Sequence, residues 1–173
     1  MEKQIILLCG LPLSGKTTLG KKLSARLKIP FLDIDEIRHA LFQNPPEEME
    51  SEQDRFQMEV SYKALFYIIE VLTKLGHSFI IAAIFSREER QKRAIEILGI
   101  ETKVVHCFAP EQVIKRRIIE REERRNSFSG CRTWEHYKAD QERYQIFPSP
   151  RLDLDTSQSA KECLRKIIRF VGA

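Results

Sequence analysis

The stretch Gly10-Leu-Pro-Leu-Ser-Gly15-Lys16-Thr17 decides the fold of this chain. It fits the pattern G-x-x-x-x-G-K-[ST] at every fixed position, directly after the apolar run Gln4–Cys9 and directly before a helical pattern. Glycines at the two fixed positions let the backbone turn sharply and approach an anion closely. The N–H groups of such a turn and of the following helix then point at phosphate oxygens. The sequence therefore predicts a phosphate-binding loop between a strand and a helix.

The side chains of Lys16 and Thr17 carry the chemistry of this loop. The Lys16 ammonium is expected to reach the β- and γ-phosphates of a nucleotide, and the Thr17 hydroxyl is expected to bind Mg²⁺. ATP and Mg²⁺ are therefore the predicted cofactors, although the pattern does not separate ATP from GTP. The residues predicted to contact the nucleotide in this loop are Gly10, Leu11, Pro12, Leu13, Ser14, Gly15, Lys16, Thr17 and Thr18.

Outward from the loop, apolar runs alternate with helical patterns along a single expected domain, residues 1–173. Strands are expected at Gln4–Cys9, Phe31–Asp33, Phe79–Ile84, Val104–Phe108 and Arg151–Leu154. Helices are expected at Lys16–Leu27, Asp35–Phe42, Glu48–Leu75, Arg87–Leu98, Glu111–Arg125 and Trp134–Tyr144, and from the capping box at Ser159 to about Val171. The alternation predicts a three-layer α/β P-loop NTPase fold with a five-stranded, mostly parallel sheet.

The composition is that of an ordinary globular domain, with 42% hydrophobic and 31% charged residues. Apolar runs such as Phe79–Phe85 are far shorter than the roughly 20 residues of a membrane span, and the N-terminal run is too short for a secretory signal. The four cysteines lack the spacing of a metal or redox motif, so we expect a cytoplasmic protein with reduced thiols. A net charge of +4 favours anionic ligands but is too small to indicate nucleic acid.

The local sequence GLPLSGKTT resembles the GxPGSGKST of small P-loop kinases, with Leu13 in place of the usual glycine. These kinases are related to adenylate kinase, gluconate kinase, chloramphenicol phosphotransferase and the kinase half of polynucleotide kinase, and the resemblance extends more weakly over nearly the whole chain. It implies an ATP-dependent kinase that moves the γ-phosphate to a hydroxyl of a small-molecule acceptor. A polynucleotide 5′-hydroxyl kinase and a non-catalytic nucleotide-binding switch stay open as alternatives. Neither the acceptor nor the choice between monomer and homodimer is fixed by a motif.

The stretch Asp33-Ile-Asp35-Glu-Ile-Arg38 lies where the second strand ends and a helix begins. Ligands of open α/β sheets bind at this end of the strands, where a carboxylate can orient an acceptor hydroxyl and take its proton. Arg38, one helical turn further on, is expected to bind an anionic part of the acceptor. The related kinases carry a similar D-[DE]-x-x-R stretch, which implies that Asp35 is the base, with Asp33 in reserve. The alternative is that Asp33 and Glu36, at capping-box spacing, only cap the helix.

The helix expected at Glu111–Arg125 changes from apolar to cationic along one stripe. The stripe begins with Val113, Ile114 and Ile118 and continues with Arg117, Arg121, Arg124 and Arg125. Arginines in such a place can neutralise the transferring phosphoryl group and close with a lid. Arg117-Ile-Ile-Glu-Arg121 resembles the R-x-x-x-R that starts the lid of these kinases, which implies a lid at about 117–132, catalytic roles for Arg117 and Arg121, and nucleotide contact by Arg117. The alternative is a surface helix with ion pairs.

Two further positions are singled out by the resemblance. The third strand of related kinases often carries an aspartate, and Ala82 stands at the aligned position. Asp33, Asp35, or the phosphates together with Thr17 would then have to hold the metal, or activity would be reduced. In related kinases the loop that follows the last strand passes the adenine, which implies a nucleotide contact by Thr156, with a plain turn as the alternative.

Overall fold

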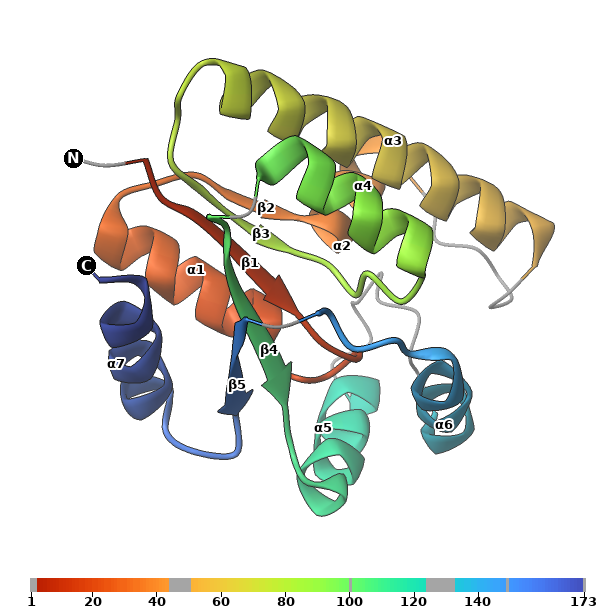
Figure 1. Ribbon diagram of the computed structural model, residues 1–173. Coiled ribbons are helices and arrows are strands. Elements are labelled where there is room, and N and C mark those ends of the chain that lie inside the picture. Colours follow the sequence, from red (N-terminus) through yellow and green to blue (C-terminus); the bar gives the residue numbers. More distant parts are fainter. Residues whose placement is uncertain (1–2, 44–50, 100, 124–132, 149, 173) are drawn as a thin grey trace.

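The computed structural model describes residues 3–43, 51–99, 101–123, 133–148 and 150–172. Its strands are β1 (Ile5–Cys9), β2 (Phe31–Asp33), β3 (Phe79–Ala82), β4 (Lys103–Phe108) and β5 (Arg151–Asp155). They form one sheet in the order β2-β3-β1-β4-β5, and every pair of neighbours is parallel (Figure 1). The predicted fold is therefore confirmed, and the sheet is wholly rather than mostly parallel.

The helices are α1 (Lys16–Leu27), α2 (Ile34–Leu41), α3 (Glu52–Lys74), α4 (Glu88–Leu98), α5 (Glu111–Glu123), α6 (Trp134–Arg143) and α7 (Ala160–Val171). Most ends lie within two residues of the prediction. The start of α3 differs most, because Ser51 caps it by accepting a 3.1 Å hydrogen bond from the Asp54 N–H. The predicted Arg124 and Arg125, and the lid segment from 124 to 132, lie outside the described residues.

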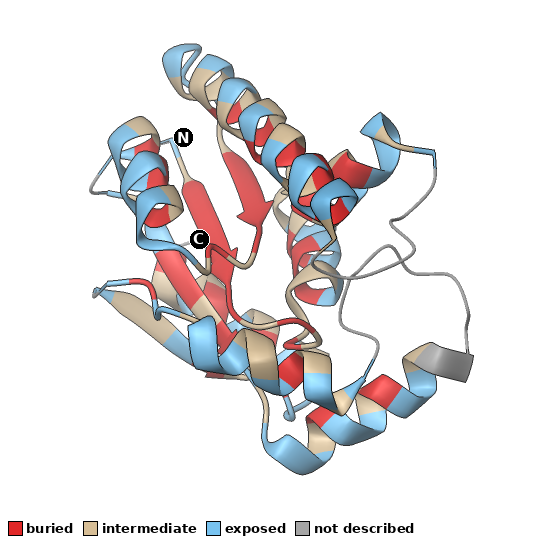
Figure 2. Ribbon diagram, turned by 90° about the vertical axis from the view of Figure 1, so that its right-hand side faces the viewer, coloured by how far each residue is buried: buried red, intermediate tan, exposed pale blue. Residues whose placement is uncertain are grey.

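Helices cover both faces of the sheet, which is why its central strands are buried along their length (Figure 2). Successive residues of β1 point to opposite sides, so Leu7 packs with α3 and α4 whereas Leu8 packs with α1 and α7. Figure 1 shows these two helix pairs on either side of the sheet, with α5 and α6 beyond the carboxyl ends of the strands. No helix of the described part of the chain is long and apolar enough to cross a membrane.

The register of the strands decides which residues meet at their carboxyl ends. Asp33, the last residue of β2, pairs with Ala82, the last residue of β3, and Ala82 pairs with Leu8 of β1. The phosphate-binding loop begins directly after β1. At the far edge, β5 carries Arg151 and Asp153, whose side chains are joined by a 2.9 Å hydrogen bond. An acid from the edge strand β2 and the loop after the central strand β1 are thus brought to the same end of the sheet.

Candidate functional site

The glycines of the loop are required by its backbone. Gly10 has a φ of 136°, and a Cβ at this position would lie 2.1 Å from the carbonyl oxygen of Cys107 on β4. Gly15 has a φ of 86° and immediately precedes α1, so its backbone turns the chain into the helix. The loop is therefore folded tightly against the sheet.

Leu13 stands where related kinases usually have glycine, and it adopts a left-handed backbone with a φ of 63°. This conformation costs a residue with a Cβ roughly 1–2 kcal/mol. The side chains of Leu11 and Leu13 pack against a buried cluster in which Ile114 and Ile118 of α5 meet Tyr137 of α6. This packing anchors the loop to the two helices beyond the sheet.

Lys16 bridges the two ends of the loop. Its Nζ donates to the carbonyl oxygens of Gly10 and Leu11, each at 2.8 Å, and to the Ser14 Oγ at 3.3 Å. Burial lowers the pKa of Lys16, against the attraction of nearby Asp35 and Asp33. The ammonium lines the same cavity as these two acids and is held on carbonyl groups of the loop itself.

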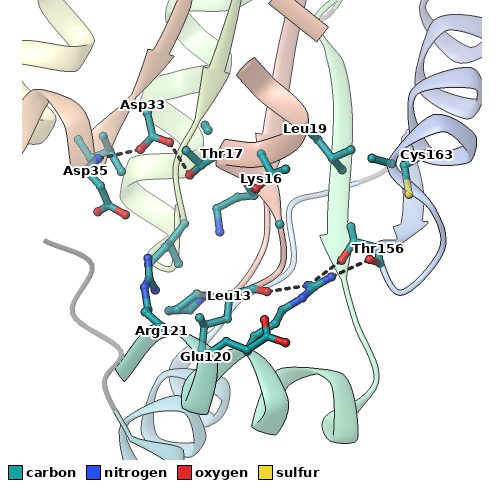
Figure 3. Close-up of a pocket in the computed structure, with 18 of the residues that line it drawn as sticks. Leu13, Lys16, Thr17, Leu19, Asp33, Asp35, Glu120, Arg121, Thr156 and Cys163 are labelled. Atoms are coloured by element: carbon teal, nitrogen blue, oxygen red, sulfur yellow. Dashed lines mark hydrogen bonds between the residues drawn. The ribbon is translucent and has the colours of Figure 1, made fainter. Parts of the chain in front are cut away.

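A cavity of about 530 Å³ extends from the loop to the ends of β2 and β3 and to the turn after β5 (Figure 3). It brings together most of the predicted site residues, namely Pro12, Leu13, Gly15, Lys16, Thr17, Thr18, Asp35, Arg117, Arg121 and Thr156. Asp33, Ala82 and Ile84 also line it. The loop residues Gly10, Leu11 and Ser14 lie behind this wall, and Arg38 is not part of the lining.

Asp33 has two roles at the end of β2, where it is almost fully buried. Its Oδ1 accepts from the Asp35 N–H at 2.9 Å and so caps α2, and its Oδ2 accepts from the Thr17 hydroxyl at 2.6 Å. Of the capping alternative, the part of Asp33 is seen, whereas the Glu36 carboxylate pairs with Lys21 on the surface at 2.6 Å. Asp33 therefore both caps α2 and lines the cavity.

The Thr17 hydroxyl and the Asp33 carboxylate fit a Mg²⁺ site. Both are hard oxygen donors, they lie in contact with each other, and both line the cavity beside the loop. Because Asp33 is the register partner of Ala82, the strand next to β3 supplies an acid where β3 has none. The sequence left open which acid takes this place, since the register of two strands cannot be read from the chain.

Asp35 lies at the cavity wall in the first turn of α2. Burial and the neighbouring Asp33 raise the pKa of Asp35, and the charges of Lys16 and Arg121 act in the opposite direction. A carboxyl group with a raised pKa is a better proton acceptor than an ordinary one. Figure 3 shows Asp35 beside Asp33, with Arg121 on α5 facing this end of the cavity.

Arg38 has a different place from the one predicted. Its side chain is 3% exposed, and its Nη2 donates to the Asp54 Oδ1 at 2.6 Å. Its Nε and Nη2 also donate to the Gln57 Oε1, at 3.1 and 3.0 Å. The guanidinium thus ties α2 to α3 inside the protein instead of facing the cavity. The sequence shows only that Asp54, Gln57 and Ser61 put polar groups at helical spacing, and the structure shows that they are buried on α3.

Arg117 clamps the loop to the turn that follows β5. Its Nη1 donates to the Leu13 carbonyl at 2.8 Å and to the Thr156 Oγ1 at 3.1 Å, and its Nη2 donates to the Thr156 carbonyl at 2.7 Å (Figure 3). Thr156 is held in turn by Phe108, whose carbonyl accepts from its N–H and its hydroxyl. The two predicted residues therefore meet, and they form a link between β4, β5 and the loop.

Two of the thiols, Cys9 and Cys107, are buried outside the cavity lining, whereas Cys163 lines the cavity. Burial raises the pKa of Cys9 and of Cys107 to about 12, so both are protonated at neutral pH. Cys163 is also a free thiol, and Cys131 lies outside the described residues. Among the residues that the structure describes, no group of three or more His, Cys, Asp or Glu side chains is placed to hold a metal ion.

Residues 5–144 match a family model described as an AAA domain, AAA_33. A shikimate kinase from Chlamydia pneumoniae is 29% identical over 123 residues, which are 67% of this chain and 68% of that protein. A sugar kinase from Janibacter sp. HTCC2649 has a similar structure, with a TM-score of 0.75 and 16% identity, over 98% of this chain and 95% of that one. A gluconokinase from Sinorhizobium meliloti 1021 follows with a TM-score of 0.72 and 14% identity, over 98% and 91%. At these identities the two structures establish a shared fold.

Proposed function

The chain belongs to the AAA domain family whose model it matches, and on this premise we propose that it is an ATP-dependent phosphotransferase that acts on a hydroxyl of a small-molecule acceptor. One observation carries the proposal. A single cavity joins the phosphate-binding loop and Lys16 to a buried acid with a raised pKa, Asp35, at the carboxyl ends of the strands. Donor and acceptor can therefore meet in one cavity, as phosphoryl transfer requires.

The donor end holds the triphosphate. The N–H groups of the loop and the start of α1 face the phosphates, and Lys16 turns from the loop carbonyls to the β- and γ-phosphates when they arrive. Arg117 holds the loop in shape through its hydrogen bonds to Leu13 and Thr156. These bonds place the turn after β5 beside the adenine of the nucleotide. Thr17 and Asp33 would hold Mg²⁺, which when bound offsets the negative charge of the phosphates.

The transfer takes place beside Asp35. The acceptor oxygen attacks the γ-phosphorus while its proton passes to the Asp35 carboxylate. The bond between the γ-phosphorus and the bridging oxygen breaks, and its electron pair leaves with ADP. Lys16 and Arg121 offset the charge of the phosphoryl group in flight. The raised pKa of Asp35 predicts that activity is lost on acidification at a higher pH than an ordinary aspartate would give.

Asp33 also bears on the non-catalytic alternative. That alternative depends on Ala82, which removes an acid from β3. Because Asp33 lies next to Ala82 in the register and contacts Thr17, the acid is supplied from β2. This arrangement favours an active enzyme over a nucleotide-binding switch.

The test is a pair of measurements on purified protein with Mg²⁺. Calorimetry is expected to detect ATP binding, and ADP release is expected to rise when the correct hydroxyl acceptor is added. Asp35→Asn should lower turnover by about 10²–10⁴-fold while ATP affinity changes little. Lys16→Met should lower turnover about 10²–10³-fold, whereas Lys22→Met on the exposed side of α1 should not.

Two outcomes would contradict the proposal. Wild-type protein that binds no ATP would contradict it as a whole. Full turnover by Asp35→Asn would remove Asp35 from the role of base while leaving the assignment of the donor end intact.

A further inference from the structure

Helix α3 has apolar side chains on two faces, and the structure buries one of them. The buried face packs against the sheet through Leu65 and Ile69. A second set of apolar residues, spaced three or four apart, forms an outer stripe that consists of Val60, Ala64, Tyr67, Val71 and Leu75. Tyr67 and Leu75 are 71% and 66% exposed. An exposed stripe with this spacing is typical of a helix that packs against another helix.

One margin of the outer stripe is charged, and the charges along it come from Glu59, Lys63, Glu70 and Lys74. Within the chain, Lys63 lies 3.8 Å from Glu59 and Lys74 lies 2.7 Å from Glu70, and arginines of α4 lie 3.8 and 3.9 Å from the two glutamates. The four side chains are all at least 37% exposed. Exposed ion pairs contribute little to stability, so a further charged partner can join them.

The order of these charges is self-complementary when the helix is reversed. Glu59 and Lys74 lie equally far from the middle of the outer stripe, and so do Lys63 and Glu70. Two antiparallel copies of α3 therefore place each of these lysines opposite a glutamate of the other copy. A parallel pair would instead set the charged margin against the apolar margin, which carries Ile68. The charge pattern thus favours a second copy of this chain, in the antiparallel direction, as the partner of the stripe.

The apolar side chains of the outer stripe fit the same register. Val60 faces Val71 of the other copy, and the small Ala64 faces the ring of Tyr67. We propose that the protein forms a dimer in which the outer stripes of two copies pack antiparallel about a twofold axis. Each contact then occurs twice, as in any isologous interface. Figure 1 shows the end of α3 near the amino ends of the strands, so the cavity at their carboxyl ends stays open in both copies.

Analytical ultracentrifugation of the purified wild-type protein measures the dimer directly. A dimer is expected at micromolar concentrations, and it should dissociate on dilution according to mass action. A wild-type protein that is monomeric at every concentration up to its solubility limit would overturn the proposal.

Tyr67→Arg tests the outer stripe. The variant brings two cations together at the centre of the interface, and it should raise the dissociation constant of the dimer at least about tenfold. Ile119→Arg is the matched control, because it makes the same kind of change at a side chain of α5 that is 59% exposed, and its dissociation constant should stay at the wild-type value. Circular dichroism checks that both variants are folded. An unchanged dissociation constant for Tyr67→Arg would overturn the role of the stripe.

Lys63→Glu and Glu70→Lys test the antiparallel register. Each variant alone sets like charges against each other twice, so its dimer should be weakened about three- to tenfold. In an equimolar mixture of the two variants, every opposed pair is again a lysine and a glutamate, and heterodimers of wild-type affinity are expected in native mass spectrometry. An effect confined to one chain could not be reversed by mixing. Homodimers and heterodimers in statistical proportion would overturn the antiparallel arrangement.

Discussion

The donor and acceptor ends of the cavity are built in different ways. At the donor end, eight consecutive residues form a loop by backbone geometry, and the left-handed Gly10 and Gly15 shape it. Behind the acceptor end, outside the cavity lining, side chains from separate helices meet, as when Arg38 of α2 contacts Asp54 and Gln57 of α3. The first kind of site is written in one stretch of sequence, and the second exists only once the helices have packed.

The two regions also depend on different interactions for their stability. The donor end depends on close backbone approach, in which a single added carbon cannot be accommodated. The region behind the acceptor end depends on a buried charge pair, in which the loss of one partner leaves the other without compensation. Four changes test this contrast, from the largest expected effect to the smallest.

Arg38→Met should break the region behind the acceptor end. It leaves the Asp54 carboxylate buried and without its guanidinium, at an expected cost of about 3–5 kcal/mol in the free energy of unfolding. Urea unfolding measures this loss. The control is Glu36→Gln, which breaks the exposed pair with Lys21 and should cost less than about 1 kcal/mol. Similar losses in the two variants would show that the buried pair has no special weight.

Gly10→Ala should break the donor end. The new Cβ would overlap the Cys107 carbonyl oxygen at 2.1 Å and would also strain a positive φ. We expect a loss of about 3 kcal/mol or more in unfolding free energy, together with loss of ATP binding in calorimetry. Gly76→Ala is the control, because it shares the positive φ but meets open space, and it should cost only about 1–2 kcal/mol. Equal costs at the two positions would argue against the close contact with β4.

Asp35→Asn should stabilise the protein at neutral pH. The pKa of Asp35 is raised on folding, so its contribution to stability is present below the ordinary carboxyl pKa and is lost as pH rises through the folded value. The variant should therefore match the wild-type Tm near pH 3 and exceed it at pH 7. Burial acts to raise the pKa of Asp153, but the hydrogen bonds and charges of Arg151 and His106 together lower it, so Asp153→Asn should have the opposite sign. A lower Tm for Asp35→Asn at pH 7 would contradict the assigned environment.

Leu13→Gly should be more stable than Leu13→Ala, which reverses the usual order of these residues. Both variants lose the packing of Leu13 on the α5–α6 cluster, but only glycine relieves the φ of 63°. The expected difference is about 1 kcal/mol in unfolding free energy, measured by urea titration. The usual order, with alanine ahead, would indicate that the left-handed backbone relaxes when the side chain is shortened.

Much of the fold was predictable because it is encoded locally. The continuously apolar strands and the helical patterns predicted a sheet covered by helices on both faces. The loop motif predicted the place of Lys16 and Thr17 at the cavity. Arg38 was misjudged because its partner lies sixteen residues further along the chain, on a helix whose contact with α2 no local pattern reveals. The sequence offered Asp33 as one of several groups that could stand in for an acid at Ala82, but it could not show that the two residues are neighbours, since this depends on the register between β2 and β3.

The outer strands of the sheet have a consequence for behaviour at high concentration. β2, at one margin, offers only three residues for pairing, and β5, at the other, carries the charged Arg151 and Asp153. Short or charged margins are poor templates for a further strand from a neighbouring molecule. The sheet therefore ends at both sides in a way that discourages growth into fibrils, although its interior is made of continuously apolar segments that would otherwise promote it.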